Sequence, residues 1–223
     1  MRGTPLLLIL GLLCGQLKGQ SRLVEQLAKG KDQLVVVYGT SLSSGERGGA
    51  WMGEVSRQLN ARYDGHLDYI LSGKGGMWST WGVQHLEDSV IAKHPDVVII
   101  EFAINDAFED YHTPLSVSEL NLRYMVDRIK LSDPSCEIIL QVMNMPVGTS
   151  AEYRPALGSY YQMYRRVARS MGLLLVDHYA NWQKILDQGR EEFLEYVPDG
   201  IHPSNKSGRE IIAPKIIETL MGN

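Results

Sequence analysis

The sequence is poor in the features that mark disulfide-linked and metal-binding proteins. Its 223 residues include only two cysteines, Cys14 and Cys136. Cys14 lies in a segment that we expect to be removed, so no intrachain disulfide can stabilise the mature chain. The pattern H-E-x-x-H and paired C-x-x-C motifs are both missing, and scattered histidines are more often core or surface residues than ligands. We therefore expect no metal and no other cofactor.

The sequence also has no excess of basic residues. Lysine and arginine number 22 against 26 acidic residues, which gives a net charge of −4. Removal of residues 1–19 takes away Arg2 and Lys18 and no acidic residue, and so changes the formal charge from −4 to −6. We expect such a chain to bind neither nucleic acid nor anionic lipid surfaces.

Long hydrophobic runs are confined to the amino terminus. Arg2 precedes the run PLLLILGLLC, and small or polar residues follow through Gly15 and Gly19, which is the layout of a secretory signal peptide. The run is too short to span a bilayer comfortably, but no clean A-x-A cleavage site follows it, so a retained anchor is the alternative. We predict a signal peptide over residues 1–19 and a single domain over residues 20–223.

The predicted signal directs the chain to the periplasm or to the outside of the cell. Cys14 raises the question of a lipid anchor, but bulky Leu13 stands where lipoprotein processing usually requires a small residue. We expect an exported protein without a lipid anchor and without stable membrane association after the signal is removed.

The chain does contain a regular alternation of apolar and amphipathic segments. Strands are expected at residues 33–38, 66–71, 96–102, 136–143 and 173–178. Helices are expected at residues 21–30, 49–63, 81–92, 117–129 and 154–171, and from about residue 205, where Pro214 should bend the last helix. Apolar strands that alternate with helices predict an α/β fold in three layers, with a mainly parallel sheet of about five strands between helices.

The first predicted strand delivers a serine at its carboxyl end, where the reactive groups of such sheets gather. The segment VVVYGTSLSSG spans residues 35–45, and Ser41 follows Gly39 by two residues. A serine hydroxyl is a poor nucleophile unless a base takes its proton, so a catalytic Ser41 requires a histidine. The alternative is that Ser41 caps the next helix.

The best candidate for that base lies in the segment VPDGIHPS. Asp199 precedes His202 by three residues, and Gly200 permits a sharp turn between them. Such a turn can place the carboxylate beside the imidazole, where it fixes the tautomer and stabilises the imidazolium. The alternatives are a surface turn that happens to contain a histidine, and a rival base at His178, next to Asp177.

Two further segments offer hydrogen-bond donors for a developing oxyanion. In EFAINDA, Asn105 could direct its side-chain amide at the oxyanion, whereas Asp106 is more simply a cap for the next element of the chain. In LSGKGGMWS, glycines let a backbone N–H approach a ligand closely. The expected donors are the N–H groups of Ser41 and Gly76 and the amide of Asn105.

Together, the four segments resemble the four sequence blocks of the SGNH, or GDSL-type, hydrolase family, in the same order. The resemblance implies that Ser41 is the nucleophile, that Gly76 and Asn105 help to form the oxyanion hole, and that Asp199 and His202 are the acid and the base. It also implies a flavodoxin-like fold and ester hydrolysis through an acyl-enzyme.

The chain departs from the family pattern at three positions. Thr40 stands where the family has aspartate, Leu71 where the second block often has asparagine, and Ala103 where the third block has glycine. None of these positions is expected to supply a proton or an oxyanion donor. Glycines 73 and 75 are the alternatives to Gly76 as the donor from this block.

Other hydrolase and phosphate-binding patterns fit the sequence less well. An α/β-hydrolase requires G-x-S-x-G, and Ser43 occupies the final glycine position. A phosphate-binding loop requires G-x-x-x-x-G-K-[ST], and SGKGG lacks both the first glycine and the hydroxyl.

Three residues are candidate contacts to the substrate. Trp78 and Trp81 follow Gly76, and their three-residue spacing would place both on one side of a helical turn, where flat aromatic faces suit sugar rings. The alternative is that both tryptophans pack in the core. Arg154 could contact an acidic sugar, or nothing.

These residues and the predicted export favour an extracytoplasmic carbohydrate O-acetyl esterase, whose partner is a small-molecule or carbohydrate ester. A lysophospholipase, a thioesterase or a short-chain arylesterase is the alternative enzyme. The alternative that is not an enzyme is a carbohydrate-binding relative without turnover.

Overall fold

The fold is built on five parallel strands. The structure is a computed structural model that describes residues 20–222, so the predicted signal peptide at residues 1–19 lies outside the described residues. The strands are β1 (Gln33–Gly39), β2 (Leu67–Leu71), β3 (Val97–Glu101), β4 (Glu137–Val142) and β5 (Leu174–Asp177). They pair in the order β2-β1-β3-β4-β5, and every pair is parallel. All five predicted strands are confirmed, and no bound differs by more than one residue.

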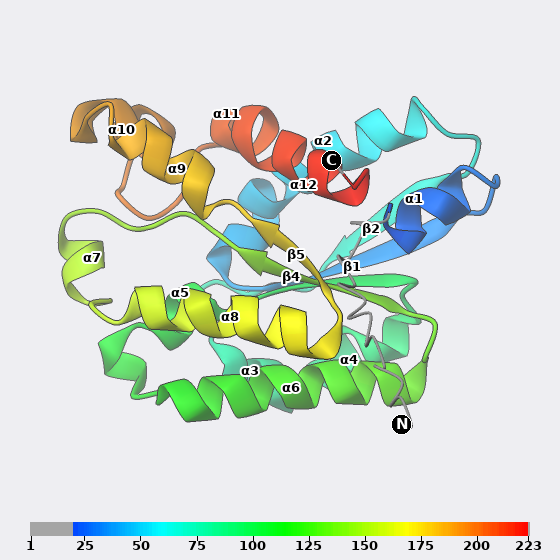
Figure 1. The fold of residues 1–223 in the computed structure, drawn as a ribbon, viewed down its shortest axis with the longest axis horizontal. Helices are drawn as coiled ribbons and strands as arrows, with labels where there is room; N and C mark the ends of the chain where they lie inside the picture. Colours follow the sequence, from blue (N-terminus) through cyan, green and yellow to red (C-terminus); the bar gives the residue numbers. More distant parts are fainter. Residues whose placement is uncertain (1–19, 223) are drawn as a thin grey trace, which may run out of the picture.

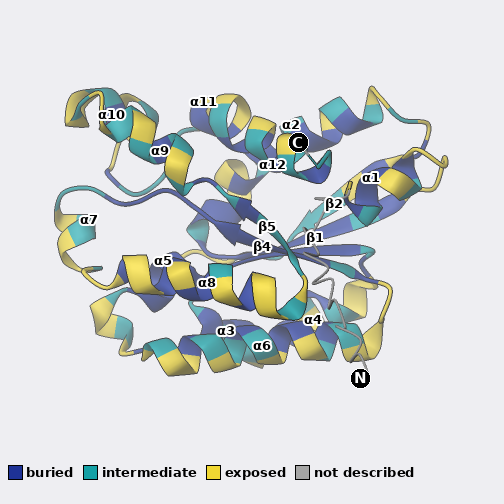
Figure 2. Cartoon of the chain, viewed as in Figure 1, coloured by how far each residue is buried: buried dark blue, intermediate teal, exposed yellow. Residues whose placement is uncertain are grey.

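Apolar side chains explain why these segments form a buried sheet. Val37 aligns with Ile99, Ile99 with Ile139, and Ile139 with Leu174, so one layer of branched side chains crosses four strands. All residues of β3 are buried. The sheet is correspondingly dark throughout its centre in Figure 2, as expected for parallel strands that are covered on both faces.

Helices cover both faces of the sheet and confirm the three-layer prediction (Figure 1). One face carries α2 (Gly45–Asn60) and α12 (Ala213–Leu220), and the other carries α3 (Ser79–Gln84), α6 (Leu115–Ser132) and α8 (Leu157–Met171). The shorter helices are α1 (Arg22–Leu27), α4 (Leu86–Ser89), α5 (Ala103–Asp106), α7 (Thr149–Glu152), α9 (Tyr179–Leu186), α10 (Arg190–Tyr196) and α11 (Asn205–Ser207). Among residues 20–222, no helix combines the length and the apolar character that a membrane crossing requires.

The helices differ from the prediction in several places. The helix expected at residues 81–92 is broken into α3, α4 and a 3₁₀ turn. Helices α5, α7, α9 and α10 were not predicted; α9 and α10 connect β5 to the segment that carries His202. The last helix changes its winding just before Pro214, in a π-helical turn over Gly208–Ile212. Pro214 itself lies in the first turn of α12, where its missing N–H costs little.

The strand order determines where a site can form. Because β1 lies between β2 and β3, the chain leaves β1 and β3 in opposite directions across the sheet. This is the switch point at which open parallel sheets bind ligands. Ser41 follows β1, and Asn105 follows β3, so both lie at this crevice.

Gly82 tests how tightly α3 packs on the core. A Cβ at this position would lie 2.9 Å from two ring atoms of Phe102 and 3.1 Å from the sulfur of Met125. Phe102 is fully buried, so its ring has little room to move. We predict that Gly82→Ala lowers the free energy of unfolding by about 1–3 kcal/mol, as measured by urea denaturation.

Gly158, in α8, provides the matched control because a Cβ there meets nothing within 4 Å. Gly158→Ala should leave stability unchanged or raise it slightly. Equal stability of the two variants would contradict the close packing described for α3.

Candidate active site

Three polar side chains form a continuous hydrogen-bonded chain at the carboxyl edge of the sheet. The Oγ of Ser41 lies 2.8 Å from Nε2 of His202. The Nδ1 of the same ring lies 2.7 Å from Oδ2 of Asp199. Ser41 and His202 are half-buried. The structure therefore brings together the three residues that the sequence nominated as nucleophile, base and acid, although positions 41 and 202 lie 161 residues apart.

The turn between Asp199 and His202 forms the carboxylate–imidazole pair locally. Oδ1 of Asp199 accepts hydrogen bonds from the backbone N–H groups of Ile201 (3.1 Å) and His202 (2.7 Å). Gly200 has φ +80°, which only glycine adopts without strain. Partial burial alone would raise the pKa of Asp199, but these hydrogen bonds outweigh burial and hold the pKa below its ordinary value. Asp199 is therefore an anion that can stabilise an imidazolium.

Two contacts from the segment after β4 hold this turn in place. The side-chain amide of Asn144 donates to the carbonyl oxygen of Ile201 (3.0 Å), and the N–H of Val147 donates to the carbonyl oxygen of Gly200 (2.8 Å). Asn144 is fully buried and was missed from sequence. A lone asparagine after a strand has no motif around it that would have distinguished it.

A buried carboxyl holds the segment that carries Ser41 through hydrogen bonds. Oε2 of Glu101 accepts hydrogen bonds from the backbone N–H (3.2 Å) and the hydroxyl (2.8 Å) of Thr40 and from the hydroxyl of Ser43 (3.1 Å). Gly39 is needed beside it, because a Cβ there would lie 2.4 Å from the carbonyl oxygen of Glu101. The one sequence signal for this anchor is an acidic residue at the end of the apolar strand VVIIE.

These contacts leave the hydroxyl of Ser41 free to meet His202. The cap of the short 3₁₀ turn over Ser41–Ser43 is Thr40, whose hydroxyl accepts from the N–H of Leu42 (3.2 Å). The residue before α2 is Ser44. Ser41 therefore caps neither element.

Glu101 and Asp106 are two buried carboxyls whose pKa values are raised. Burial raises the pKa of Glu101 to about 7 and that of Asp106 to about 6. Asp106 accepts hydrogen bonds from the hydroxyl of Ser118 and from the N–H of Ser79 (2.8 Å). It therefore caps α3, which precedes it in the chain, and not an element that comes after it.

The three expected oxyanion donors lie on segments that follow β1, β2 and β3. The amide nitrogen of Asn105 donates one hydrogen to the carbonyl oxygen of Met77 (2.8 Å), which leaves its second hydrogen unused. Within residues 20–222, no acceptor within hydrogen-bonding distance faces the N–H of Ser41 or that of Gly76. Gly75 lies next to Ser41, and the carbonyl oxygen of Met77 accepts the amide of Asn105. The three donors therefore lie on adjoining segments, and an oxyanion requires that all three point at one position.

The three glycines between β2 and α3 occupy their positions for different structural reasons. Gly76 has φ +72°, and its carbonyl oxygen accepts the hydroxyl of Tyr111 (2.6 Å). Gly73 packs against the nucleophile segment, since a Cβ there would lie 2.9 Å from the carbonyl oxygen of Ser43. Gly75 lies beside Ser41, since a Cβ there would lie 3.7 Å from the Cβ of Ser41.

Arg154 lies behind Asn105 and directs its guanidinium at protein oxygens. It donates to the carbonyl oxygens of Ile104 (2.8 Å) and Ser150 (3.0 Å), and a third nitrogen lies 3.5 Å from Oδ1 of Asn105. Its guanidinium also lies 4.7 Å from the ring centre of Phe108. This arrangement suits a residue that orients Asn105 better than one that contacts an acidic sugar.

The two tryptophans do not share one surface. Trp78 has an extended backbone just before α3, so helical spacing does not relate it to Trp81. The ring of Trp78 stacks on Tyr111, with centroids 4.6 Å apart, next to Gly76. Trp81 instead packs against the core, 5.7 Å from Tyr38 and 6.5 Å from Phe102.

His178 has no contact with Ser41. It is fully buried, its Nε2 lies 3.1 Å from the amide nitrogen of Gln141, and burial lowers its pKa to about 3. Its neighbour Asp177 pairs with Arg165 at 2.7 Å. In the described part of the chain, no three His, Cys, Asp or Glu side chains are grouped as metal ligands.

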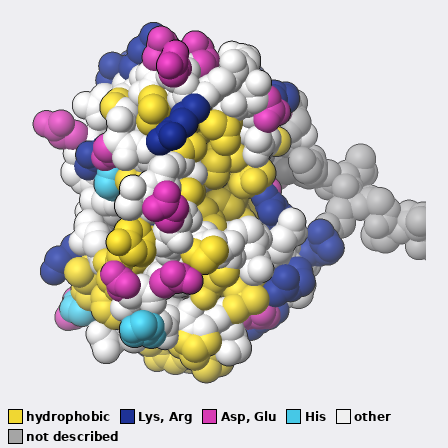
Figure 3. All heavy atoms as spheres, turned by 90° about the vertical axis from the view of Figure 1, so that its left-hand side faces the viewer, with side chains coloured by type: hydrophobic (Ala, Val, Ile, Leu, Met, Phe, Trp, Pro, Cys, Tyr) yellow, Lys and Arg dark blue, Asp and Glu magenta, His cyan; other side chains and the backbone are white. Residues whose placement is uncertain are grey.

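The face at the carboxyl ends of the strands is the one drawn in Figure 3, where hydrophobic side chains form a band across the middle with acidic side chains beside it.

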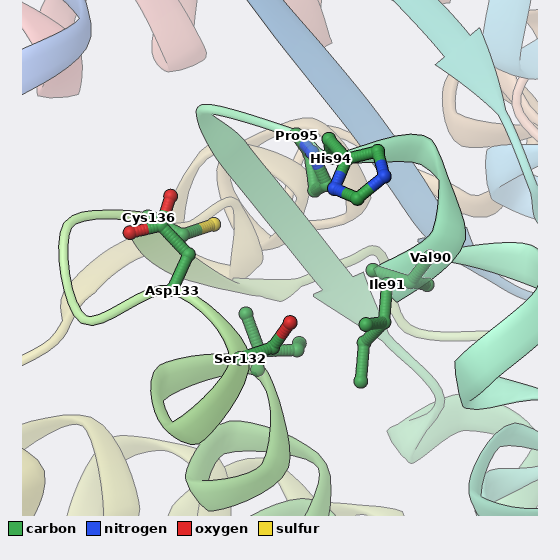
Figure 4. Close-up of a pocket in the computed structure, with 8 residues that line it drawn as sticks. Val90, Ile91, His94, Pro95, Ser132, Asp133 and Cys136 are labelled. Carbon is green, nitrogen blue, oxygen red and sulfur yellow. The ribbon is translucent and has the colours of Figure 1, made fainter.

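A separate hollow of about 70 Å³ lies at the opposite, amino-terminal edge of the sheet (Figure 4). It contains His94 and Cys136, and burial raises the pKa of that thiol to about 12. The hollow is therefore remote from Ser41, and the thiol of Cys136 is protonated at neutral pH.

Comparisons with known proteins identify a matching family and similar folds. The profile of the GDSL-like lipase/acylhydrolase family matches residues 37–207. An acetylxylan esterase from Geobacillus stearothermophilus has a similar fold, with a TM-score of 0.73 and 22% identity over 86% of this chain and 96% of that chain. A lipase/acylhydrolase from Enterococcus faecalis gives a TM-score of 0.71 and 21% identity over 85% of this chain and 96% of that chain. The comparison with curated proteins finds no match.

Glu101→Gln should reduce the pH dependence of stability, and the part that comes from Asp106 should remain. The pKa of this carboxyl is about 7 in the folded chain and about 4.5 in an unfolded one. Between these pH values the unfolded chain binds fewer protons than the folded chain. The contribution of Glu101 to the free energy of unfolding is therefore fully present below pH 4.5 and is lost as the pH rises to about 7. Its slope is at most about 1.4 kcal/mol per pH unit. An uncharged glutamine has no such slope.

The measurement is urea denaturation between about pH 5 and pH 8. The exposed Glu195 provides the control, because Glu195→Gln should keep the wild-type pH dependence. A Glu101→Gln variant with the wild-type slope would show that Glu101 is ionised in the fold at all of these pH values.

Proposed function

The chain belongs to the GDSL-like lipase/acylhydrolase family, since the family profile matches residues 37–207, and we propose that it is a serine esterase that removes acetyl groups from carbohydrates. The observation that carries the chemistry is the chain of hydrogen bonds from Ser41 through His202 to Asp199, at 2.8 and 2.7 Å. Such a chain can deprotonate a hydroxyl that is otherwise a weak nucleophile.

In the proposed acylation step, Oγ of Ser41 forms a bond to the ester carbonyl carbon, and its proton moves to Nε2 of His202. The carbonyl oxygen becomes an oxyanion, which the N–H groups of Ser41 and Gly76 and the amide of Asn105 stabilise. When the carbon–oxygen bond to the alcohol breaks, His202 gives its proton to the departing alcohol oxygen. Water then attacks the acyl-enzyme, with His202 again as base, and releases acetate and free Ser41.

The carbohydrate part of the proposal depends on the surroundings of the site. Trp78 and Tyr111 present a stacked aromatic pair beside Gly76, which suits the apolar faces of sugar rings. The predicted export gives access to cell-surface or extracellular polysaccharides. One of the similar folds is that of an acetylxylan esterase, which supports the substrate class by analogy of fold alone.

Ser41→Ala provides the direct test of the chemistry. We predict that it lowers kcat/KM for p-nitrophenyl acetate by at least about 1,000-fold, because the nucleophile is lost. Ser159→Ala, an exposed serine on α8, should match the wild type. Equal rates for Ser41→Ala and the wild type would refute the serine mechanism, and no hydrolysis by either would favour a carbohydrate-binding protein without turnover.

The acyl preference of the wild type tests the substrate class. Release of acetate from acetylated xylan, with little activity on p-nitrophenyl octanoate or a lysophospholipid, is the expected pattern. Preference for the octanoate or the lysophospholipid would replace the carbohydrate esterase with a lipid esterase or thioesterase.

Asn105→Ala and Arg154→Met should both act on kcat. Loss of one oxyanion donor lowers kcat by on the order of 100- to 1,000-fold with a smaller effect on KM, because the oxyanion forms only along the reaction path. If Arg154 acts by orienting Asn105, Arg154→Met also lowers kcat, and the double variant loses little more than Asn105→Ala alone. Independent losses, or an Arg154 effect on KM alone, would assign Arg154 to substrate binding.

A further inference from the structure

A polar groove of about 500 Å³ opens beside His202. Its walls are the segment just after the nucleophile, residues 44–47, and the two stretches around the base, residues 198–199 and 202–205. No residue from the segments that carry Gly76 or Asn105 lines it. Ser41 does not line it either, so the groove adjoins the site at Asp199 and His202.

The order of bond changes decides which part of an ester lies on that side. The carbonyl oxygen must face the donors of Ser41, Gly76 and Asn105. The departing alcohol oxygen must lie next to Nε2 of His202, because it takes its proton from that atom. The alcohol portion of the ester therefore extends from His202 toward the groove, and the acyl portion extends elsewhere.

The groove is built from groups that suit an alcohol with many hydroxyls. Glu46 offers hydrogen-bond acceptors, Arg47 offers donors, and Asn205 offers both, and all three side chains are exposed along the walls. Within residues 20–222, no ion pair engages Glu46 or Arg47. An alkyl chain would gain little here, whereas sugar hydroxyls, each a donor and an acceptor, can pair with all three side chains.

We propose that this groove is the binding site for the sugar portion of the ester, with Glu46, Arg47 and Asn205 as its hydrogen-bonding residues. The proposal rests on the proposed function, because it takes its direction from the proton transfer by His202. It has a kinetic consequence. The sugar leaves when Ser41 is acylated, so these residues act on acylation by a carbohydrate ester and have no effect on hydrolysis of the acetyl-enzyme.

The test compares two acetyl esters that give the same acetyl-enzyme. Arg47→Gln and Asn205→Ala should each lower kcat/KM for acetylated xylo-oligosaccharides by about 5- to 20-fold, the effect of a lost hydrogen bond of about 1–2 kcal/mol. For p-nitrophenyl acetate, whose leaving group carries no further hydroxyls, kcat/KM should stay within about twofold of the wild type. Arg169→Gln, an exposed arginine of α8, should leave both substrates unchanged.

Two results would overturn the proposed sugar-binding role of the groove without contradicting the proposed esterase activity. An equal loss on both esters would mean that the substitutions disturb His202, and no loss on the oligosaccharide would mean that the groove is not used. Failure of the proposed function gives a different result, the absence of any Ser41-dependent hydrolysis.

Direct binding tests the groove without turnover. Calorimetric titration of Ser41→Ala with acetylated xylo-oligosaccharides should show binding that Ser41→Ala combined with Arg47→Gln weakens by about 5- to 20-fold. Equal affinity of the two proteins would overturn the proposal whether or not the chain is an esterase.

Discussion

The hydrogen bond between Ser41 and His202 joins segments near opposite ends of the described chain, and the rest of the fold holds the two groups at this distance. Parallel strands bring their carboxyl ends to one edge, so Ser41 after β1 and Asn105 after β3 are neighbours by topology. His202 belongs to no strand. It reaches the same edge because Asn144 and Val147 donate hydrogen bonds to the carbonyl oxygens of Ile201 and Gly200, the two middle residues of its turn.

The nucleophile segment depends on a buried carboxyl in the same way. Three hydrogen bonds from Thr40 and Ser43 converge on one oxygen of Glu101, and they fix the residues on both sides of Ser41. The departure of Thr40 from the family's aspartate becomes intelligible here, because a threonine hydroxyl can donate to Glu101 whereas a second carboxylate would repel it. A buried carboxyl with a raised pKa costs stability above neutral pH. The same carboxyl holds Ser41 in a fixed position.

Much of this arrangement could be predicted from sequence, and the failures have physical causes. Local patterns sufficed for the strands and for the turn from Asp199 to His202, since apolar periodicity and a three-residue turn are short-range properties. Helical spacing failed for Trp78 and Trp81 because the helix begins only after Trp78. Glu101, Asn144 and the contacts of Arg154 depend on tertiary neighbours, and nothing local distinguishes such residues from other polar residues beside a strand.

The central claim is that the site activates Ser41 as a nucleophile, and its most direct measurement is covalent labelling with a fluorophosphonate. The phosphorus bonds to an activated serine oxygen with loss of fluoride, and mass spectrometry of the digested protein locates the adduct. The account predicts one adduct per chain, on the peptide that contains Ser41, and strongly reduced labelling in His202→Ala. Absence of an adduct at Ser41, or labelling that is as fast without His202, would contradict the account.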